Sequence, residues 1–412
     1  MRRQLLVLAT GLLLAAVACA GEDNQGASLS APATTAAGAM AETGSPSSAT
    51  TEQFLSGMFT EEVEPGVRRV LNDGFRDLTH PSDGYPWECE RIIVGDNDQV
   101  WRARSCWQLY RLGHEGEWDY DREWVNLGWS RSFASLDGRL WALESGGLSP
   151  TDPYYLRMFD DGVWVPDPRL DVPSESGQIY VEDDGTVWLL AQDTIHWAAD
   201  TAFEGEALSG SSSWTDGWVG EGDRDGVFLL SVTNDGVVWL MTERAADGTV
   251  SFLRFDGETW EVVPAPDGFD GWPGGAGGAF GAGVSADGVF WAAADSLAPH
   301  QSLARLDEDG WTTFSGADGV RPWGGQRAWW NAKMDTLWVA PDGSAWVNAS
   351  VAAIRADGSL GCDGLGRFDG ETWRSFLSGR CISDLGFAPD GSAWVVARDP
   401  WGYQVQTYVI LP

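Results

Sequence analysis

Short apolar runs separated by Asp-Gly turns recur along the chain beyond residue 60. Two of them, Val187–Ala191 and Val237–Met241, are apolar at every position. Runs of this length, bounded by turn residues, are typical of strands that are buried on both faces. The pattern therefore predicts a protein built from many short, closely packed β-strands.

A tight turn followed by tryptophan is the repeating unit. The octapeptide APDGSAWV at residues 340–347 returns letter for letter at residues 388–395, and looser copies precede both. Tryptophans mark the copies at intervals of 40 to 55 residues, a period that indicates a propeller or a solenoid. The marking residues are Trp101, Trp141, Trp188, Trp239, Trp291, Trp346 and Trp394.

A second motif alternates with the first. RFDGETW at residues 254–260 returns at residues 367–373, and looser copies end at Trp118, Trp164 and Trp311. Most repeats therefore hold two hairpins, and so four strands. The sequence predicts an all-β fold, a seven-bladed β-propeller of four-stranded blades, over residues 61–412.

The last repeat is too short to supply four strands. Residues 68–78 look like a degenerate copy of the RFDGETW segment, with Phe75 in the place of the tryptophan. We expect this N-terminal segment to complete the last blade and close the ring, which would remove exposed sheet edges.

Proline fixes the conformation of two of the turns. Pro341 and Pro389 stand directly before Asp-Gly, and their fixed φ excludes a type I′ turn. The sequence predicts a type I turn closed by Gly343 or Gly391 in the left-handed region, with the aspartate bonded to its own backbone. The tryptophan that follows should pack into the interior.

The first 60 residues have a different composition. Arg2 and Arg3 precede an apolar run of signal-peptide length, and small residues lead up to Cys19. Residues 1–19 are similar to a lipoprotein signal peptide with a lipobox, and residues 20–60 read as a flexible Ala/Ser/Thr-rich tether. We expect an extracytoplasmic protein whose only contact with the cell membrane is the lipid on Cys19; without lipidation it would be secreted.

Charge and cysteine content restrict the partners and the redox state. The formal net charge of −35 argues against nucleic acid as a partner, and nothing in the sequence requires an oligomer, so we expect a monomer. The other four cysteines of this exported chain suggest two disulfides. Three pairings are possible, and the short loops favour Cys89–Cys106 and Cys362–Cys381.

The two repeated motifs together resemble the propeller repeats of two-component-regulator sensors. The resemblance covers about residues 64–412 and implies an extracytoplasmic sensing or binding module. Virginiamycin B lyase-like propellers and sialidases have related repeats, so a propeller lyase or glycoside hydrolase is the alternative. The lyase chemistry needs paired histidines, whereas the four histidines here lie far apart, and the one sialidase-like box, residues 183–188, lacks its leading serine.

The candidate binding surface is the set of long loops. In a four-stranded meander both Asp-Gly turns lie on one face, so the long connections open on the other, where binding usually resides. Aromatic rings beside arginines suit carbohydrates, peptides or carboxylates. The candidate residues are Trp129, Arg131, Trp272, Arg321, Trp323, Arg327, Trp329 and Trp330.

No catalytic motif, cofactor motif or complete metal-ligand spacing stands in the sequence, so we expect no cofactor and binding rather than catalysis. The predicted function is therefore capture of an unknown extracellular ligand or protein, such as a carbohydrate or a peptide, through the long-loop face. A passive surface scaffold is the third alternative.

Overall fold

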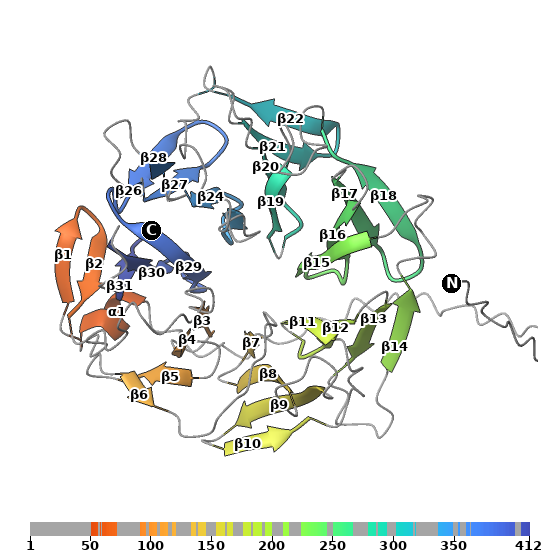
Figure 1. The fold of residues 1–412 in the computed structure, drawn as a ribbon, viewed down its shortest axis with the longest axis horizontal. Coiled ribbons are helices and arrows are strands. Elements are labelled where there is room, and N and C mark those ends of the chain that lie inside the picture. Colours follow the sequence, from red (N-terminus) through yellow and green to blue (C-terminus); the bar gives the residue numbers. More distant parts are fainter. Residues whose placement is uncertain are drawn as a thin grey trace, which may run out of the picture. The chain divides into compact units, whose positions relative to one another are not determined.

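The computed structural model describes most of residues 51–71 and, between residues 91 and 412, the strands with most of their short turns. Residues 1–50, 72–90 and connecting stretches such as 121–132, 267–278 and 319–336 lie outside the described part. Within the unit Ser47–Pro412, seven antiparallel sheets follow one another around a ring (Figure 1). The predicted seven-bladed β-propeller is confirmed.

Blades 1 to 4 are regular meanders whose first strand lies toward the centre of the ring (Figure 1). Their strands are β3 (Arg91–Val94), β4 (Val100–Arg104), β5 (Gln108–Leu112) and β6 (Trp118–Tyr120); β7 (Phe133–Leu136), β8 (Arg139–Ser145), β9 (Tyr154–Asp160) and β10 (Val163–Pro166); β11 (Ser176–Val181), β12 (Val187–Ala191), β13 (Thr194–Ala198) and β14 (Ser209–Ser213); and β15 (Arg224–Val232), β16 (Val238–Arg244), β17 (Val250–Phe255) and β18 (Trp260–Pro264).

Blade 5 is a four-stranded meander of the same kind. Blade 6 carries a small inserted hairpin between its second and third strands. The strands are β19 (Ala279–Val284), β20 (Phe290–Ala294), β21 (Ser302–Asp307) and β22 (Gly310–Phe314); and β23 (Leu337–Val339), β24 (Ala345–Asn348), β27 (Leu365–Phe368) and β28 (Trp373–Phe376), with β25 (Ala353–Ile354) and β26 (Leu360–Gly361) forming the hairpin.

Blade 7 combines the two ends of the described chain. Its order is β29 (Cys381–Phe387), β30 (Ala393–Arg398), β31 (Val405–Ile410), β2 (Val67–Val70) and β1 (Thr60–Glu64). Strand β2 pairs with β31 in antiparallel register, with Val67 opposite Ile410. The degenerate motif around Phe75 lies outside the described residues, and closure of the ring by the N-terminal segment stays a prediction.

Each Asp-Gly turn has the predicted geometry where proline precedes it. In blade 6 the N–H of Gly343 donates to the carbonyl of Ala340 at 2.8 Å, and the N–H of Ala340 donates to the carbonyl of Ser344 at 2.9 Å. Gly343 has φ of 78° and Gly391 has φ of 83°, in the left-handed region that glycine adopts without strain. The type I turn with a following glycine bulge is therefore confirmed.

All seven repeat tryptophans are buried, as predicted, with exposed fractions between 0 and 6%. They belong to seven apolar clusters, each built from two neighbouring blades. The cluster between blades 4 and 5 contains Trp239, Phe252 and Phe290, and the cluster between blades 7 and 1 contains Trp394 and Val100. Every blade is thus held to the next by burial of apolar surface.

A buried carboxylate adds a polar link between blades 7 and 1. Asp384, which is 6% exposed, accepts the backbone N–H of Ile92 at 2.8 Å and lies 3.8 Å from the Arg91 guanidinium. Buried charges are tolerated when they are hydrogen-bonded in this way. The contact between the last and first blades is therefore specific as well as apolar.

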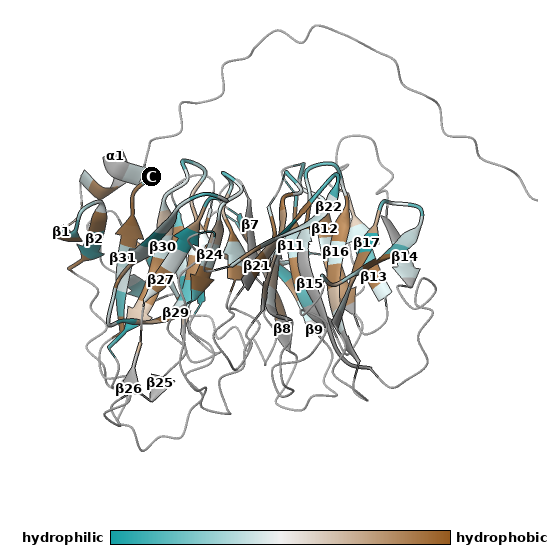
Figure 2. Ribbon diagram, turned by 90° about the horizontal axis from the view of Figure 1, so that it is seen from above, coloured by the Kyte–Doolittle hydropathy of each residue, from teal (hydrophilic) through white to brown (hydrophobic). Residues whose placement is uncertain are grey.

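The described part of the chain includes a helix before residue 61, the predicted start of the propeller. Helix α1 (Thr51–Ser56) lies at the end of the strands where the polar turns gather, whereas β25 and β26 lie at the opposite end (Figure 2). Leu55 is 1% exposed and Met58 is 7% exposed, so these two side chains belong to the core. Helix α1 lies within the last ten positions of the predicted tether over residues 20–60, most of which lies outside the described residues. The two pairs Phe54-Leu55 and Met58-Phe59, four residues apart, were the sequence signal for this segment.

One predicted disulfide is confirmed. Cys362 and Cys381 are bonded, with their Cα atoms 4.9 Å apart. The bridge ties the end of the inserted hairpin to the first residue of β29. Cys89, Cys106 and Cys19 lie outside the described residues, so the second disulfide and the lipidation stay predictions. Among the described residues, no helix is long and apolar enough to cross a membrane.

Candidate functional site

The eight long-loop residues predicted to bind all lie outside the described part of the chain. They are Trp129, Arg131, Trp272, Arg321, Trp323, Arg327, Trp329 and Trp330. Whether these residues lie close together is therefore not tested, and the long-loop binding surface stays a prediction. A pocket that the structure does describe lies at the opposite end of the strands, among the Asp-Gly turns.

A tryptophan–arginine pair across two strands is the local unit from which this pocket is built. The repeat tryptophan on the second strand faces an arginine on the third: Trp291 faces Arg305 and Trp346 faces Arg367. In both blades the guanidinium carbon lies 5.6 Å from the centre of the indole, a cation–π distance. Blade 4 has the same register, with Trp239 opposite Arg254.

In blade 6 a serine in the Asp-Gly turn binds both members of the tryptophan–arginine pair. The Ser344 hydroxyl accepts the indole N–H of Trp346 at 3.1 Å and the Nε–H of Arg367 at 3.2 Å, and it donates to Asp342 at 2.6 Å. Arg367 also forms an ion pair with Asp342. Burial raises the pKa of Asp342, but the hydrogen bonds from Ser344 and the charge of Arg367 outweigh it and lower the pKa. The indole N–H, the guanidinium, the serine and the aspartate are therefore paired with one another within the blade.

Blade 5 has Val289 at the serine position and satisfies the indole differently. The N–H of Trp291 donates to the backbone carbonyl of Gly343, in the turn of the next blade, at 2.8 Å. Arg305 turns to Asp307, with Nε 2.9 Å from the carboxylate. Loss of the serine hydroxyl is thus compensated by the neighbouring blade.

Blade 4 also has valine at this position, Val237, but has no such compensation. Among the described residues, the indole N–H of Trp239 has no hydrogen-bond partner, although the side chain is only 5% exposed. Arg254 pairs with Glu261 on β18 at 3.5 Å instead of with the turn. The unpaired N–H groups of Trp101 and Trp188 are enclosed in protein, whereas that of Trp239 faces a cavity.

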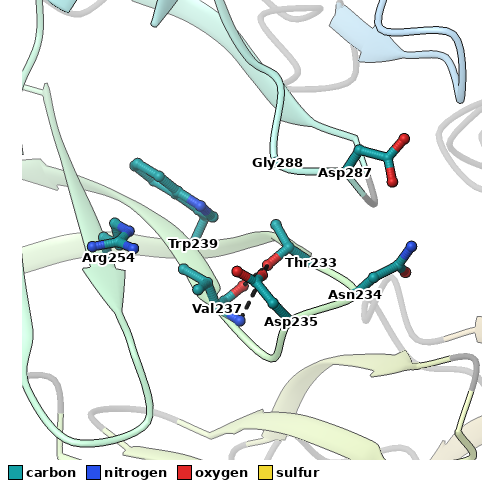
Figure 3. Close-up of a pocket in the computed structure, with 8 residues that line it drawn as sticks. All are labelled: Thr233, Asn234, Asp235, Val237, Trp239, Arg254, Asp287 and Gly288. Carbon is teal, nitrogen blue, oxygen red and sulfur yellow. Dashed lines mark hydrogen bonds between the residues drawn. The ribbon is translucent and has the colours of Figure 1, made fainter. Parts of the chain in front are cut away.

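The cavity has a volume of about 410 Å³, within the range of small-molecule sites. It lies between the turn of blade 4 and the turn of blade 5. Figure 3 shows the nitrogen-bearing edge of Trp239 directed toward the space between these turns, with Arg254 on one side and Asp287 on the other. The lining residues are Thr233, Asn234, Asp235, Val237, Trp239, Arg254, Asp287 and Gly288.

The turns around the cavity are rigid and present polar groups. Gly236 and Gly288 have φ of 79° and 83°, which fixes the two glycine bulges. The Thr233 hydroxyl donates to one oxygen of Asp235 and accepts the N–H of Val237 at 3.1 Å. The second oxygen of Asp235 has no partner among the described residues. The pocket therefore offers donors at one end and acceptors at the other.

The titration behaviour of the described residues reflects turn structure. Asp256, Asp342, Asp369 and Asp390 have lowered pKa values, and each accepts hydrogen bonds inside its own turn. Within the described ranges, no three His, Cys, Asp or Glu side chains come together as metal ligands. The chemistry that this pocket shows is hydrogen bonding and charge.

No family model and no curated protein matches the chain, but solved propellers are similar to it in fold. YCF48 from Cyanidioschyzon merolae has 11% identity and a TM-score of 0.47, with 80% of this chain and 98% of that one covered. An oligogalacturonate lyase in complex with manganese has 12% identity and a TM-score of 0.48, with 86% and 96% covered. A gluconolactonase from Xanthomonas campestris has 12% identity and a TM-score of 0.37, with 79% and 95% covered. These likenesses concern the fold alone.

Sequence reasoning missed this pocket because it treated every Asp-Gly turn as structural. A signal was nevertheless present in the alignment of the repeats. The residue after Asp-Gly is serine in the two verbatim repeats, Ser344 and Ser392, and valine in blade 4. In blade 6 the tryptophan and the arginine both use this hydroxyl, so valine at the same position in blade 4 indicates an indole N–H that must find another acceptor.

Proposed function

We propose that this chain is an exported binding propeller, held to the cell membrane by a lipid on Cys19, that captures a ligand without transforming it. The signal-peptide features of residues 1–19 support the location. The observation that carries the binding function is the indole N–H of Trp239, which has no partner among the described residues and faces a cavity. An acceptor on a ligand can reach this N–H, and the hydrogen bond formed would contribute about 1 kcal/mol.

The pocket supports recognition by polar groups more than by stacking. The ring of Trp239 packs on Phe290, with centroids 4.7 Å apart, so only its polar edge is offered to a ligand. Arg254 adds a second donor, and Asp235 and Asp287 add acceptors. A few convergent polar groups on a rigid frame are the usual means by which a pocket fixes a ligand's orientation.

The proposal is tested by labelling the tryptophan side chains with ¹⁵N and adding a mixture of small amides, alcohols, amines and carboxylates. Trp239→Phe removes the N–H but keeps an aromatic ring, and so identifies the Trp239 resonance. We expect this resonance to shift on addition of the fragments. In the control, Trp291→Phe identifies the N–H that is already bonded to Gly343, which should not shift.

The outcome that contradicts binding at this pocket is a Trp239 resonance that none of the fragments moves. In that case the long-loop face, with Trp323 among its predicted residues, becomes the next surface to test. A passive scaffold is supported if neither surface responds.

A further inference from the structure

The turn end of blade 7 already holds a peptide segment, and it comes from the same chain. Thr51, at the start of α1, donates its backbone N–H to one oxygen of Asp390 at 2.7 Å and its hydroxyl to the other at 3.0 Å. Leu55 and Met58 pack in the apolar cluster that contains Trp394. The molecule thus shows how a turn aspartate and the adjoining cluster can hold a short peptide.

Asp235 and Trp239 stand at the same repeat positions in blade 4 as Asp390 and Trp394 do in blade 7. In each blade the aspartate belongs to the Asp-Gly turn, and the tryptophan follows it by four residues. Thr233 uses one oxygen of Asp235 and leaves the other available. Asp390 uses its corresponding acceptor capacity to bind the N–H of Thr51.

From this correspondence we infer that the blade 4 pocket binds a short peptide segment of another polypeptide chain. The inference rests on the proposed function and specifies the ligand for it. A peptide unit has one donor and one acceptor, so it matches both ends of the pocket. Its N–H donates to Asp235, as that of Thr51 does to Asp390, and a carbonyl accepts the N–H of Trp239.

Charge narrows the class of peptide. The lining carries two carboxylates, Asp235 and Asp287, and one guanidinium, Arg254, which is itself paired with Glu261. The whole chain has a formal net charge of −35. An acidic peptide is repelled at long range and at the pocket, so the bound segment is neutral or basic.

The experiment uses a phage-displayed library of random dodecapeptides selected against the full chain. Affinities of the selected peptides are then measured by calorimetry, with the peptides blocked at both ends so that only internal peptide units take part. We expect Asp235→Asn and Trp239→Phe each to weaken binding about tenfold, as loss of one hydrogen bond to a charged or buried group does. Selected sequences should be neutral or basic.

Two matched substitutions serve as controls, in blades whose turn-end polar groups already have hydrogen-bond partners. Asp342→Asn and Trp291→Phe change the same kinds of side chain in blades 6 and 5, where the polar atoms already have partners, and should leave affinity unchanged. Asp235 is exposed and Trp239→Phe keeps an aromatic ring in the cluster, so both test variants should fold; thermal unfolding verifies this.

The inference is overturned if no selected peptide depends on both Asp235 and Trp239. If small fragments still move the Trp239 resonance, the pocket binds a small ligand and the proposed function stands without the peptide. If no fragment moves the Trp239 resonance and no peptide loses affinity in the Asp235 or Trp239 variants, the proposed function fails as well.

Discussion

Replacing Val237 by serine should close the blade 4 pocket from within. In blade 6 the residue at this position is Ser344, whose hydroxyl binds the indole N–H, the guanidinium and the turn aspartate at once. Val237→Ser places the same hydroxyl beside Trp239, Arg254 and Asp235. The indole N–H of Trp239 then has an acceptor inside the protein and no longer needs one from a ligand.

The expected change in stability is small because two effects oppose each other. Val237 is 8% exposed, so losing its methyl groups costs about 1–2 kcal/mol of apolar burial. The new hydrogen bonds each contribute about 1 kcal/mol. We therefore expect the free energy of unfolding to change by less than about 1 kcal/mol.

The expected change in binding is large in comparison. A ligand would have to displace two internal hydrogen bonds, from Trp239 and Arg254, worth about 1 kcal/mol each. That corresponds to about a 30-fold loss of affinity. Calorimetry with a ligand found by fragment or peptide screening measures the loss, and the indole N–H resonance of Trp239 should shift in the free protein as the new bond forms.

The reciprocal substitution controls for changes in the turn itself. Ser344→Val removes the acceptor from Trp346 and Arg367 and leaves the buried indole N–H unpaired, which should cost about 1–3 kcal/mol of stability. Binding at blade 4 should be unaffected. Unchanged affinity in Val237→Ser together with a shifted Trp239 resonance would refute the reasoning, because the donor would then be occupied without any effect on the ligand.

Four further outcomes are expected. Burial raises the pKa of Asp369, but hydrogen bonds from Thr372 and Glu371 outweigh this effect and lower the pKa to about 2, below the usual 3.8. The ionised carboxylate therefore adds stability above pH 4, and this stability is lost as the pH falls toward 2. Denaturant unfolding should show that Asp369→Asn is less stable than the unchanged protein at pH 7 but not below pH 2. Cys19→Ser should move the protein from the membrane fraction to the medium, and an unchanged distribution contradicts lipidation. Non-reducing peptide mapping should recover Cys89 joined to Cys106; a peptide linking Cys89 to another cysteine shows that pairing to be wrong. Trp323→Ala should abolish any binding at the long-loop face while leaving thermal unfolding unchanged, and a large loss of stability would instead assign Trp323 to the core.

The fold could be predicted from the sequence because its determinants are local. A turn such as Ala340–Ser344 needs only proline, aspartate and glycine at fixed positions, and the tryptophan that follows needs only a cluster to enter. The Asp-Gly turn recurs in six of the seven repeats and the tryptophan in all seven, so one wrong assignment would have left the blade number unchanged. The disulfide between Cys362 and Cys381 was predictable for a similar reason, since its loop is short.

Helix α1 could not be predicted because what holds it lies far away in the sequence. Thr51 bonds to Asp390, 339 residues later, and Leu55 and Met58 enter a cluster formed by blades 7 and 1. The local sequence has apolar residues at helical spacing, at Phe54, Leu55, Met58 and Phe59, but a helix of six residues is too short to be stable without tertiary contacts. Tertiary contacts, which act after the blades have assembled, decide the conformation of such a segment.

The candidate site was missed for a more instructive reason: in a repeat protein the common residues specify the blade, and the departures from them leave groups unpaired. Blade 6 uses a serine hydroxyl and blade 5 uses a neighbouring carbonyl to satisfy the same indole N–H. Blade 4 uses neither, and the N–H of Trp239 faces the cavity instead. An acceptor supplied by a ligand can therefore form the hydrogen bond that the other two blades make internally, which contributes about 1 kcal/mol. The unpaired donor of Trp239 is thus a source of affinity, and the comparison between blades shows where to look for the ligand.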